Sequence, residues 1–231
     1  MVGGGTQARP GEVSLAHKGV LFLDELPEFS RPVLEALRQP LESGDITVAR
    51  ANHHVTYPAR FQLIAAMNPC RCGYLDNPLL ACAKAPRCGR DYQARISGPL
   101  FDRIDLHIDV PALAPQEMTQ PSCGESRAVV ADRVAGAREV QAERFTKLGH
   151  LDLRTNAEAE GKLLDRISVL DDKGRELLLR ATERLHLTAR GYHRVLRVAR
   201  TIADLEGAEL IARGHIGEAI AFRRIALERK A

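Results

Sequence analysis

Hydrophobic residues in the first part of the chain come in short unbroken runs that are separated by turn residues. Two of these runs, at 19–23 and 61–67, end in polar side chains. Unbroken apolar runs of this length are typical of strands that are buried on both faces of a parallel sheet. We therefore expect both runs to be buried strands of such a sheet.

The segment between these two runs is expected to hold a helix and a hairpin. Ser30 is a good helix N-cap, and Pro32 suits the first helical turn. An apolar stripe follows, made of Val33, Leu34, Leu37 and Leu41, and Gly44 is its stop signal. The segments at 46–48 and 55–57 flank a polar stretch, which predicts a β-hairpin.

Residues 104–110 alternate between apolar and polar side chains, which predicts a third strand that Pro111 closes. Three prolines between 111 and 124 then indicate a linker. From Ser126 onward the apolar residues take a helical spacing. The expected organisation is an α/β part at 1–112, a linker at 113–125 and an all-helical part at 126–231.

The helical part carries stripes of apolar residues at helical spacing. The first predicted helix has Val130, Val134, Ala137 and Val140 on one face. A later helix begins after Thr188 as its N-cap and stops at Gly207, with a stripe of Leu196, Ala199, Ile202 and Leu205. This helix is expected at 188–205, and two further helices are expected at 172–185 and 215–228.

Composition and charge narrow the class of protein. The formal net charge of +3 permits nucleic-acid binding but does not argue for it. No apolar run approaches the ~18 residues of a membrane-spanning helix, and residues 1–10 lack the pattern of a signal peptide. We therefore expect a cytoplasmic protein without membrane contact, whose five cysteines are not a disulfide framework.

Polar side chains with catalytic potential follow the two buried strands. Asp24 and Glu25 come directly after the first strand, and Asn68 follows the second. The carboxyl edge of an open α/β sheet is where ligands bind. One carboxylate there can hold the water shell of Mg²⁺, the other can orient an attacking water, and the amide can hold that water or a γ-phosphate. Solvated acids and an ordinary Asn-Pro turn are the alternatives.

Arg103 stands on a Gly-Pro approach just before the predicted third strand. A guanidinium in such a place can reach a neighbouring subunit and stabilise charge on a transferring phosphoryl group. The alternative is a surface arginine paired with Asp102 or Asp105.

Cysteines cluster in a loop segment that is rich in Gly and Pro. Four of the five lie within nineteen positions, at Cys70, Cys72, Cys82 and Cys88. In a reducing compartment such a group predicts a structural Zn²⁺ site, although the spacing differs from the usual C-x₂-C pairs. The alternative is four free thiols in a flexible insert. Cys123, in the linker, is expected to be a free thiol.

The order of these motifs resembles that of magnesium-chelatase-like AAA+ ATPases, and within them the ComM/YifB group. The matching segments are 9–12, 19–25, 68–70, 98–105 and 200–205. The resemblance covers nearly the whole chain. It implies a partial AAA+ P-loop-type sheet with a hairpin insert and a helical lid, ATP and Mg²⁺ as cofactors, and hexameric rings of identical subunits.

The resemblance also implies a role for individual residues. These roles are Asp24 as the Mg²⁺-binding acid, Glu25 as the general base, Asn68 as sensor 1, Arg103 as an arginine finger acting in trans, and Arg190, with Arg194 as a weaker candidate, as sensor 2. A solvated helix arginine is the alternative for Arg190.

The predicted hairpin resembles the pre-sensor 1 hairpin of these ATPases, which points into the ring pore. Its candidate contacts with a DNA backbone are Arg50, Asn52, His53 and His54. A solvated hairpin tip is the alternative.

The phosphate-binding loop of the family, G-x-x-x-x-G-K-[S/T], does not occur in the sequence, and the glycines at 3–5 have no lysine after them. In the family this loop lies upstream of Arg9, so we expect a C-terminal portion with unpartnered strand edges and little or no ATP hydrolysis alone. The preferred function is a DNA-translocating branch-migration motor of ComM type. The alternatives are the ATPase subunit of a magnesium-porphyrin chelatase and a non-catalytic zinc and oligomerisation module.

Overall fold

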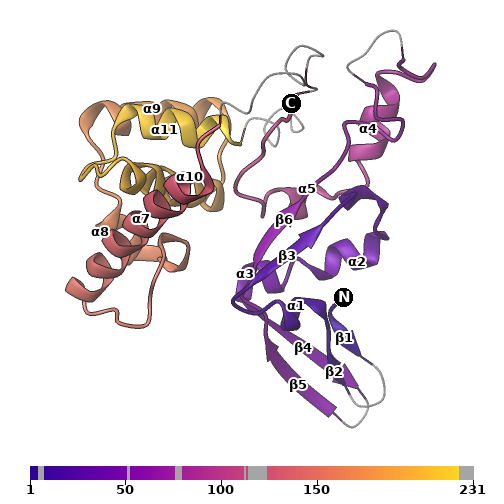
Figure 1. Ribbon diagram of the computed structural model, residues 1–231, viewed down its shortest axis with the longest axis horizontal. Helices are drawn as coiled ribbons and strands as arrows, with labels where there is room; N and C mark the ends of the chain where they lie inside the picture. Colours follow the sequence, from indigo (N-terminus) through magenta and orange to yellow (C-terminus); the bar gives the residue numbers. More distant parts are fainter. Residues whose placement is uncertain (5–7, 51–52, 76–79, 112, 114–123, 224–231) are drawn as a thin grey trace. The chain divides into compact units, whose positions relative to one another are not determined.

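A computed structural model describes residues 1–4, 8–50, 53–75, 80–111, 113 and 124–223. The chain is mixed α/β and divides into two compact units, residues 1–104 and 105–231 (Figure 1). The first unit contains β1 (Gly3–Gly4), β2 (Arg9–Pro10), α1 (Glu12–Leu15), β3 (Val20–Leu23), η1 (Leu26–Glu28), α2 (Arg31–Ala36), α3 (Pro40–Ser43), β4 (Asp45–Arg50), β5 (His53–Pro58), β6 (Gln62–Ala65), α4 (Arg87–Gln93) and α5 (Gly98–Phe101). The second contains α7 (Arg127–Lys147), η2 (Asn156–Glu158), α8 (Gly161–Ile167), α9 (Asp172–Arg184), α10 (Ala189–Leu205) and α11 (Arg213–Ala221).

Strands β3 and β6 pair in parallel, as the two apolar runs predict. Leu23 lies opposite Ala65, so both strands end at the same edge. The prediction of burial on both faces is wrong, because Val20 and Phe22 are 54% and 59% exposed and Ile64 is also exposed. Within the described residues this sheet has two strands, and no further layer covers that apolar face.

The predicted helix after Ser30 is split into α2 and α3. Ser30 is the N-cap of α2, and Gly44 ends α3 with a φ of +74° that glycine adopts without strain. Pro40 begins α3. Because proline lacks an N–H and disfavours a continuing helix before it, the chain turns at residues 37–39 and restarts.

The predicted hairpin is confirmed as β4 and β5, which pair in antiparallel fashion up to Arg50 opposite His53. Ile46 and Val48 alternate into the interior and are buried. In Figure 1 the hairpin extends away from β3 and β6.

The predicted third strand is wrong. Residues 104–110 run without regular secondary structure, and the apolar side chains of Leu106 and Ile108 are exposed. The backbone N–H of His107 donates to the carbonyl of Phe222, 2.7 Å away, at the turn that follows α11. Alternation alone does not make a strand where no neighbouring strand pairs with it.

The helical unit is built around α10. Thr188 is its N-cap, as predicted, and its Oγ1 accepts a 3.1 Å hydrogen bond from the N–H of Gly191. Gly207 follows the helix with a φ of +69° and confirms the predicted stop. The core contains Phe145, Leu164, Leu178, Val195, Leu196, Ala199, Ile202, Ile211 and Ile216. Burying each large apolar side chain stabilises the fold by ~1.5–3 kcal/mol, so this cluster dominates the stability of the unit.

The predicted apolar stripe of α7 is only partly the buried face. Val130 and Val134 are exposed, whereas Ala137, Gln141 and Phe145 are buried at a spacing of four residues. Burial therefore starts at the middle of the helix, because the described elements contact its second half.

A polar network lies inside the helical unit. The carboxylate of Asp204 is fully buried, and it pairs with the guanidinium groups of Arg144 and Arg200. Asn156 donates a 2.8 Å hydrogen bond to the same carboxylate. Arg200 also donates to two backbone carbonyls of the turn after α10, at 2.5 and 2.7 Å. The network thereby ties α7, η2 and the end of α10 together.

Candidate functional site

Asp24 and Glu25 lie exposed directly after β3. The N–H of Glu25 donates a 2.9 Å hydrogen bond to Asp24 Oδ1. Glu25 has a φ of +49°, an uncommon value for a residue other than glycine that clusters at functional sites. Buried Leu26 then donates its N–H to the carbonyl of Ala66, 3.0 Å away. This bond fixes the turn that carries both acids against the end of β6.

Asn68 lies exposed three residues after β6. The N–H of Ala66 donates to the carbonyl of Leu23 at 3.0 Å, so the parallel pairing continues to the last residue before Asp24. Asp24 and Glu25 thus follow β3, and Asn68 comes three residues after β6, beyond the carboxyl ends of two paired strands. Their roles in chemistry stay predictions.

Arg103 lies just after α5, with its side chain 9% exposed. Its guanidinium pairs with Glu42 at the end of α3, and it donates a 2.7 Å hydrogen bond to the carbonyl of Pro99. The pairing with Glu42 is one that the sequence did not predict. A role in trans requires the guanidinium to exchange Glu42 for a group on another subunit.

The two sensor 2 candidates differ in their surroundings within the helical unit. Arg190 is exposed in the first turn of α10. Arg194, one turn later, is buried and pairs with Asp105 at 2.5 Å. The ion pair ties Arg194 to Asp105 within this unit. Arg190 is the more accessible of the two cations.

The hairpin candidates lie at the end of β4 and the start of β5. Arg50 and His53 are the last backbone pair, and His54 is exposed in β5. Asn52 lies outside the described residues, and so do the side chains of Arg50 and His53.

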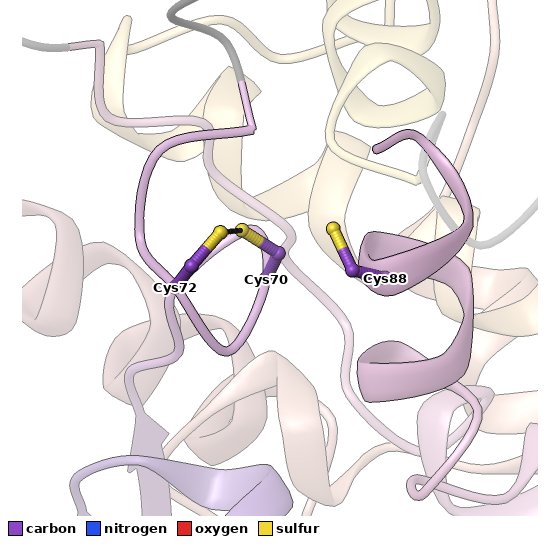
Figure 2. A group of neighbouring side chains, drawn as sticks. All are labelled: Cys70, Cys72 and Cys88. Carbon is purple, nitrogen blue, oxygen red and sulfur yellow. Dashed lines mark hydrogen bonds between the residues drawn. The ribbon is translucent and has the colours of Figure 1, made fainter. Parts of the chain in front are cut away.

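Three of the four predicted zinc ligands come together in space. The Sγ atoms of Cys70, Cys72 and Cys88 all lie within 4.8 Å of one another. Figure 2 shows Cys70 and Cys72 on one turn with their Sγ atoms facing each other, 3.0 Å apart, and Cys88 beside them on α4. Cys82 lies next to this trio rather than within the same 4.8 Å, and Cys123 lies outside the described residues.

The thiols also perturb one another electrostatically. The hydrogen bond with the Cys70 thiol lowers the pKa of Cys72 to about 6. Burial, followed by interaction with the Cys82 thiol, raises the pKa of Cys88 to about 12. Hydrogen bonds with Cys82 contribute to the pKa shifts of both Cys72 and Cys88, so the Cys82 thiol lies close to both. The arrangement is a group of four soft sulfur donors.

Sequence reasoning missed the residues that hold these groups in place. Glu42 is 61 positions from Arg103, and Asp105 is 89 positions from Arg194. Gln93 donates from α4 to the carbonyl of Pro69 at 3.3 Å. No periodic pattern connects such distant partners, so no signal in a single sequence finds them.

None of the helices in the described ranges combines the length and the hydropathy that a bilayer crossing requires.

Two family models match the chain. The model for magnesium chelatase subunit ChlI matches residues 1–118, just over half of the 231 residues, and the model for its C-terminal region matches residues 124–223. Each of the two described units thus corresponds largely to one model.

Several curated proteins are similar to this chain. The Competence protein ComM of Haemophilus influenzae is 48% identical over 225 residues, which are 96% of this chain and 42% of that protein. The uncharacterized protein YifB of Salmonella typhimurium is 46% identical, covering 97% of this chain and 43% of that protein. A magnesium-chelatase 38 kDa subunit from Cereibacter sphaeroides is 26% identical over 207 residues, covering 90% of this chain and 54% of that subunit.

The chain thus spans less than half the length of the ComM and YifB relatives. Similarity to ComM and YifB, together with the two matched regions, indicates an AAA+ ATPase-type family. The resemblance that the motifs predict is therefore confirmed, and the chain belongs to the magnesium chelatase subunit ChlI family.

Proposed function

We propose that this chain is the part of a cytoplasmic, ring-forming AAA+ ATPase that carries the acidic half of the ATP site, and that the assembled protein is a DNA-translocating motor of ComM type. The observation that supports it is the parallel pairing of β3 and β6, after which Asp24, Glu25 and Asn68 follow in the chain. Ligands bind at this edge in open α/β sheets.

In this proposal each exposed side chain has one task. Asp24 presents carboxylate oxygens, the donors that Mg²⁺ prefers, and holds the water shell of the ion. Glu25 orients the attacking water and accepts its proton, while Asn68 hydrogen-bonds that water or the γ-phosphate. ATP and Mg²⁺ supply the transferable phosphoryl group and the positive charge beside it.

Arg103 completes the site of the next subunit in the ring. Its pairing with Glu42 holds the guanidinium within its own chain in the structure described. Assembly then replaces one anionic partner, the Glu42 carboxylate, by another, the transferring phosphoryl group. Arg190, exposed at the start of α10, is the second cation of the proposal, in the sensor 2 role.

The residues present do not provide a phosphate cradle, since no loop with the required glycines and lysine occurs in the sequence. We therefore expect no measurable ATP turnover by this chain alone. A chimera in which this chain replaces the matching part of Haemophilus influenzae ComM should hydrolyse ATP, and single-stranded DNA should stimulate it. Comparable turnover by the isolated chain would contradict the proposal, as would an assembled, inactive chimera.

DNA contact is assigned to the hairpin of β4 and β5. In the chimera, Arg50→Glu should weaken binding to single-stranded DNA and lower the salt dependence of the binding constant by about one unit of logarithmic slope, because a phosphate contact is lost. Titrations at several salt concentrations measure both quantities. The matched control is Arg180→Glu, which reverses the charge of an exposed arginine in α9. An unchanged slope in Arg50→Glu would exclude the hairpin as the contact.

Two alternatives have a specific observation in their favour. The 26% identity to a magnesium-chelatase subunit favours an ATPase that serves a porphyrin chelatase. Stimulation of the chimera by a chelatase partner instead of DNA would select it. The thiol cluster favours a non-catalytic zinc and oligomerisation module, which predicts ring formation without any hydrolysis by the chimera.

We also propose that the cluster of four thiols, Cys70, Cys72, Cys82 and Cys88, holds a structural Zn²⁺. Zn–S bonds of ~2.3 Å in tetrahedral arrangement put sulfur atoms about 3.8 Å apart. Three Sγ atoms that already lie within 4.8 Å reach this spacing by small side-chain rotations. Cys82, beside the trio, is the fourth ligand.

A further inference from the structure

We propose that the zinc cluster works as a clamp on the catalytic edge, fixing both Asn68 and the turn that carries Glu25 through helix α4. The inference rests on the proposed zinc site and the proposed ATPase function, and it assigns the metal a positioning task that neither of them includes.

The first arm of the clamp is the chain that follows Asn68. Only Pro69 separates Asn68 from Cys70, and a tight turn closed by a 3.0 Å bond from the N–H of Gly73 to the carbonyl of Cys70 brings Cys72 back to the same place. Two thiol ligands therefore sit within four residues of the catalytic amide. Because the backbone between Asn68 and these two cysteines is so short, fixing the cysteines restricts the movement of Asn68.

The second arm is α4, whose second residue is Cys88. The helix lies directly on the first arm, because a Cβ at Gly89 would come within 2.7 Å of Leu75 and 3.2 Å of the carbonyl oxygen of Pro69. Gln93, one turn later, donates a hydrogen bond to the same carbonyl at 3.3 Å. Helix α4 thus packs at Gly89 against the Pro69–Cys70 peptide, one residue after Asn68, and Gln93 donates a hydrogen bond to it.

Helix α4 also reaches the other side of the site. Arg95, just beyond it, pairs at 3.0 Å with Glu28 of η1, the short helix that begins one residue after Glu25. Tyr92 is buried, and its pKa is raised by that burial and by the negative charges of Glu28 and Glu25. Helix α4 and Arg95 just beyond it therefore contact both the segment after Asn68 and the short helix η1 that follows Glu25.

The length of α4 and its exposed ion pair contribute little to holding it in place. A helix of seven residues is not stable by itself. The Arg95–Glu28 pair is exposed on both sides, and exposed pairs contribute little. A structural zinc site, in contrast, contributes folding free energy outright, because its ligands gather only in the folded chain. Zinc is the strongest constraint available to this part of the unit.

The test measures metal content and hydrogen exchange separately. Protein purified without chelator should contain one zinc per chain by elemental analysis, and so should Cys123→Ser, while Cys88→Ser should lose the metal. Exchange of amides in residues 66–75, followed by mass spectrometry, should accelerate at least tenfold when zinc is lost. Gln93→Ala should keep its zinc and exchange faster than wild type. Amides of α10 should not change in any variant.

The outcomes separate the proposals from one another. Less than half a zinc per chain in wild type overturns the metal site. A zinc-loaded wild type whose 66–75 amides are unaffected by metal removal overturns the clamp and leaves the metal site standing. Removal of zinc from wild type by a chelator gives the same comparison where Cys88→Ser fails to fold. None of these results depends on ATP turnover, which the chimera tests independently.

Discussion

Replacing Asp204 with alanine should lower the free energy of unfolding by about 3–5 kcal/mol, because it leaves two buried guanidinium groups without their anion. The carboxylate of Asp204 is fully buried between Arg200, whose side chain is 1% exposed, and Arg144, which is 20% exposed. Removing one member of such a network costs far more than the intact network contributes. Urea unfolding followed by far-UV circular dichroism measures the loss.

A matched exposed pair provides the control for this prediction. Glu176 pairs with Arg180 four residues later in α9, and both side chains are more than half exposed. Glu176→Ala should therefore change stability by less than ~1 kcal/mol. A loss of that same small size in Asp204→Ala would show that the network is not a structural unit.

The same network makes the helical unit sensitive to acid. Burial raises the pKa of Asp204, but the hydrogen bonds from Arg144 and Asn156 and the charge of Arg200 outweigh it, so the pKa lies below its ordinary value of 3.8. A lowered folded-state pKa contributes stability above the unfolded-state value, and that stability is lost as pH falls through the folded-state pKa. In Asp204→Ala, the free energy of unfolding should no longer show this part of the pH dependence.

Replacing Glu25 with glutamine in the ComM chimera should lower kcat for ATP at least 100-fold, because a general base contributes roughly 10²–10⁴-fold. Glutamine keeps the size and the hydrogen-bonding shape of glutamate, so nucleotide affinity should change little. Steady-state hydrolysis together with direct measurement of ATP binding separates the two effects.

Glu143→Gln is the control for that experiment. Glu143 is an exposed acid of α7 that pairs with Lys147, and its replacement should leave kcat within about twofold, since surface pairs contribute little. If Glu25→Gln retained most of its turnover, Glu25 would be excluded as the base, and the exposed edge of β3 and β6 would lose its catalytic assignment.

The pairing of β3 with β6 and the positions of the acids and the amide after these strands could be predicted from the sequence, because that information is local. An unbroken apolar run followed by Asp24 and Glu25, and another followed by Asn68, specify two strands and the residues at their ends. Parallel pairing then brings the ends together without any further information. The grouping of the four cysteines could also be predicted, since they lie within one short segment of the sequence.

What the sequence did not predict depends on neighbours distant along the chain. The alternation at 104–110 is real, but a strand needs a partner for its backbone, and the described chain offers none there. The apolar residues at the start of α7 show helical spacing and still lie exposed, because spacing defines a face and not its contacts. The pairing of Arg103 with Glu42 joins two residues whose separation carries no periodic signal.

The exposed apolar face of the β3–β6 pair affects how the purified protein behaves at high concentration. Val20, Phe22 and Ile64 form an exposed apolar stripe on a two-stranded sheet whose outer edges have no paired strand among the described residues. Such a surface can associate with the same surface of a second identical molecule. Recovery of monodisperse material should therefore fall as the preparation is concentrated.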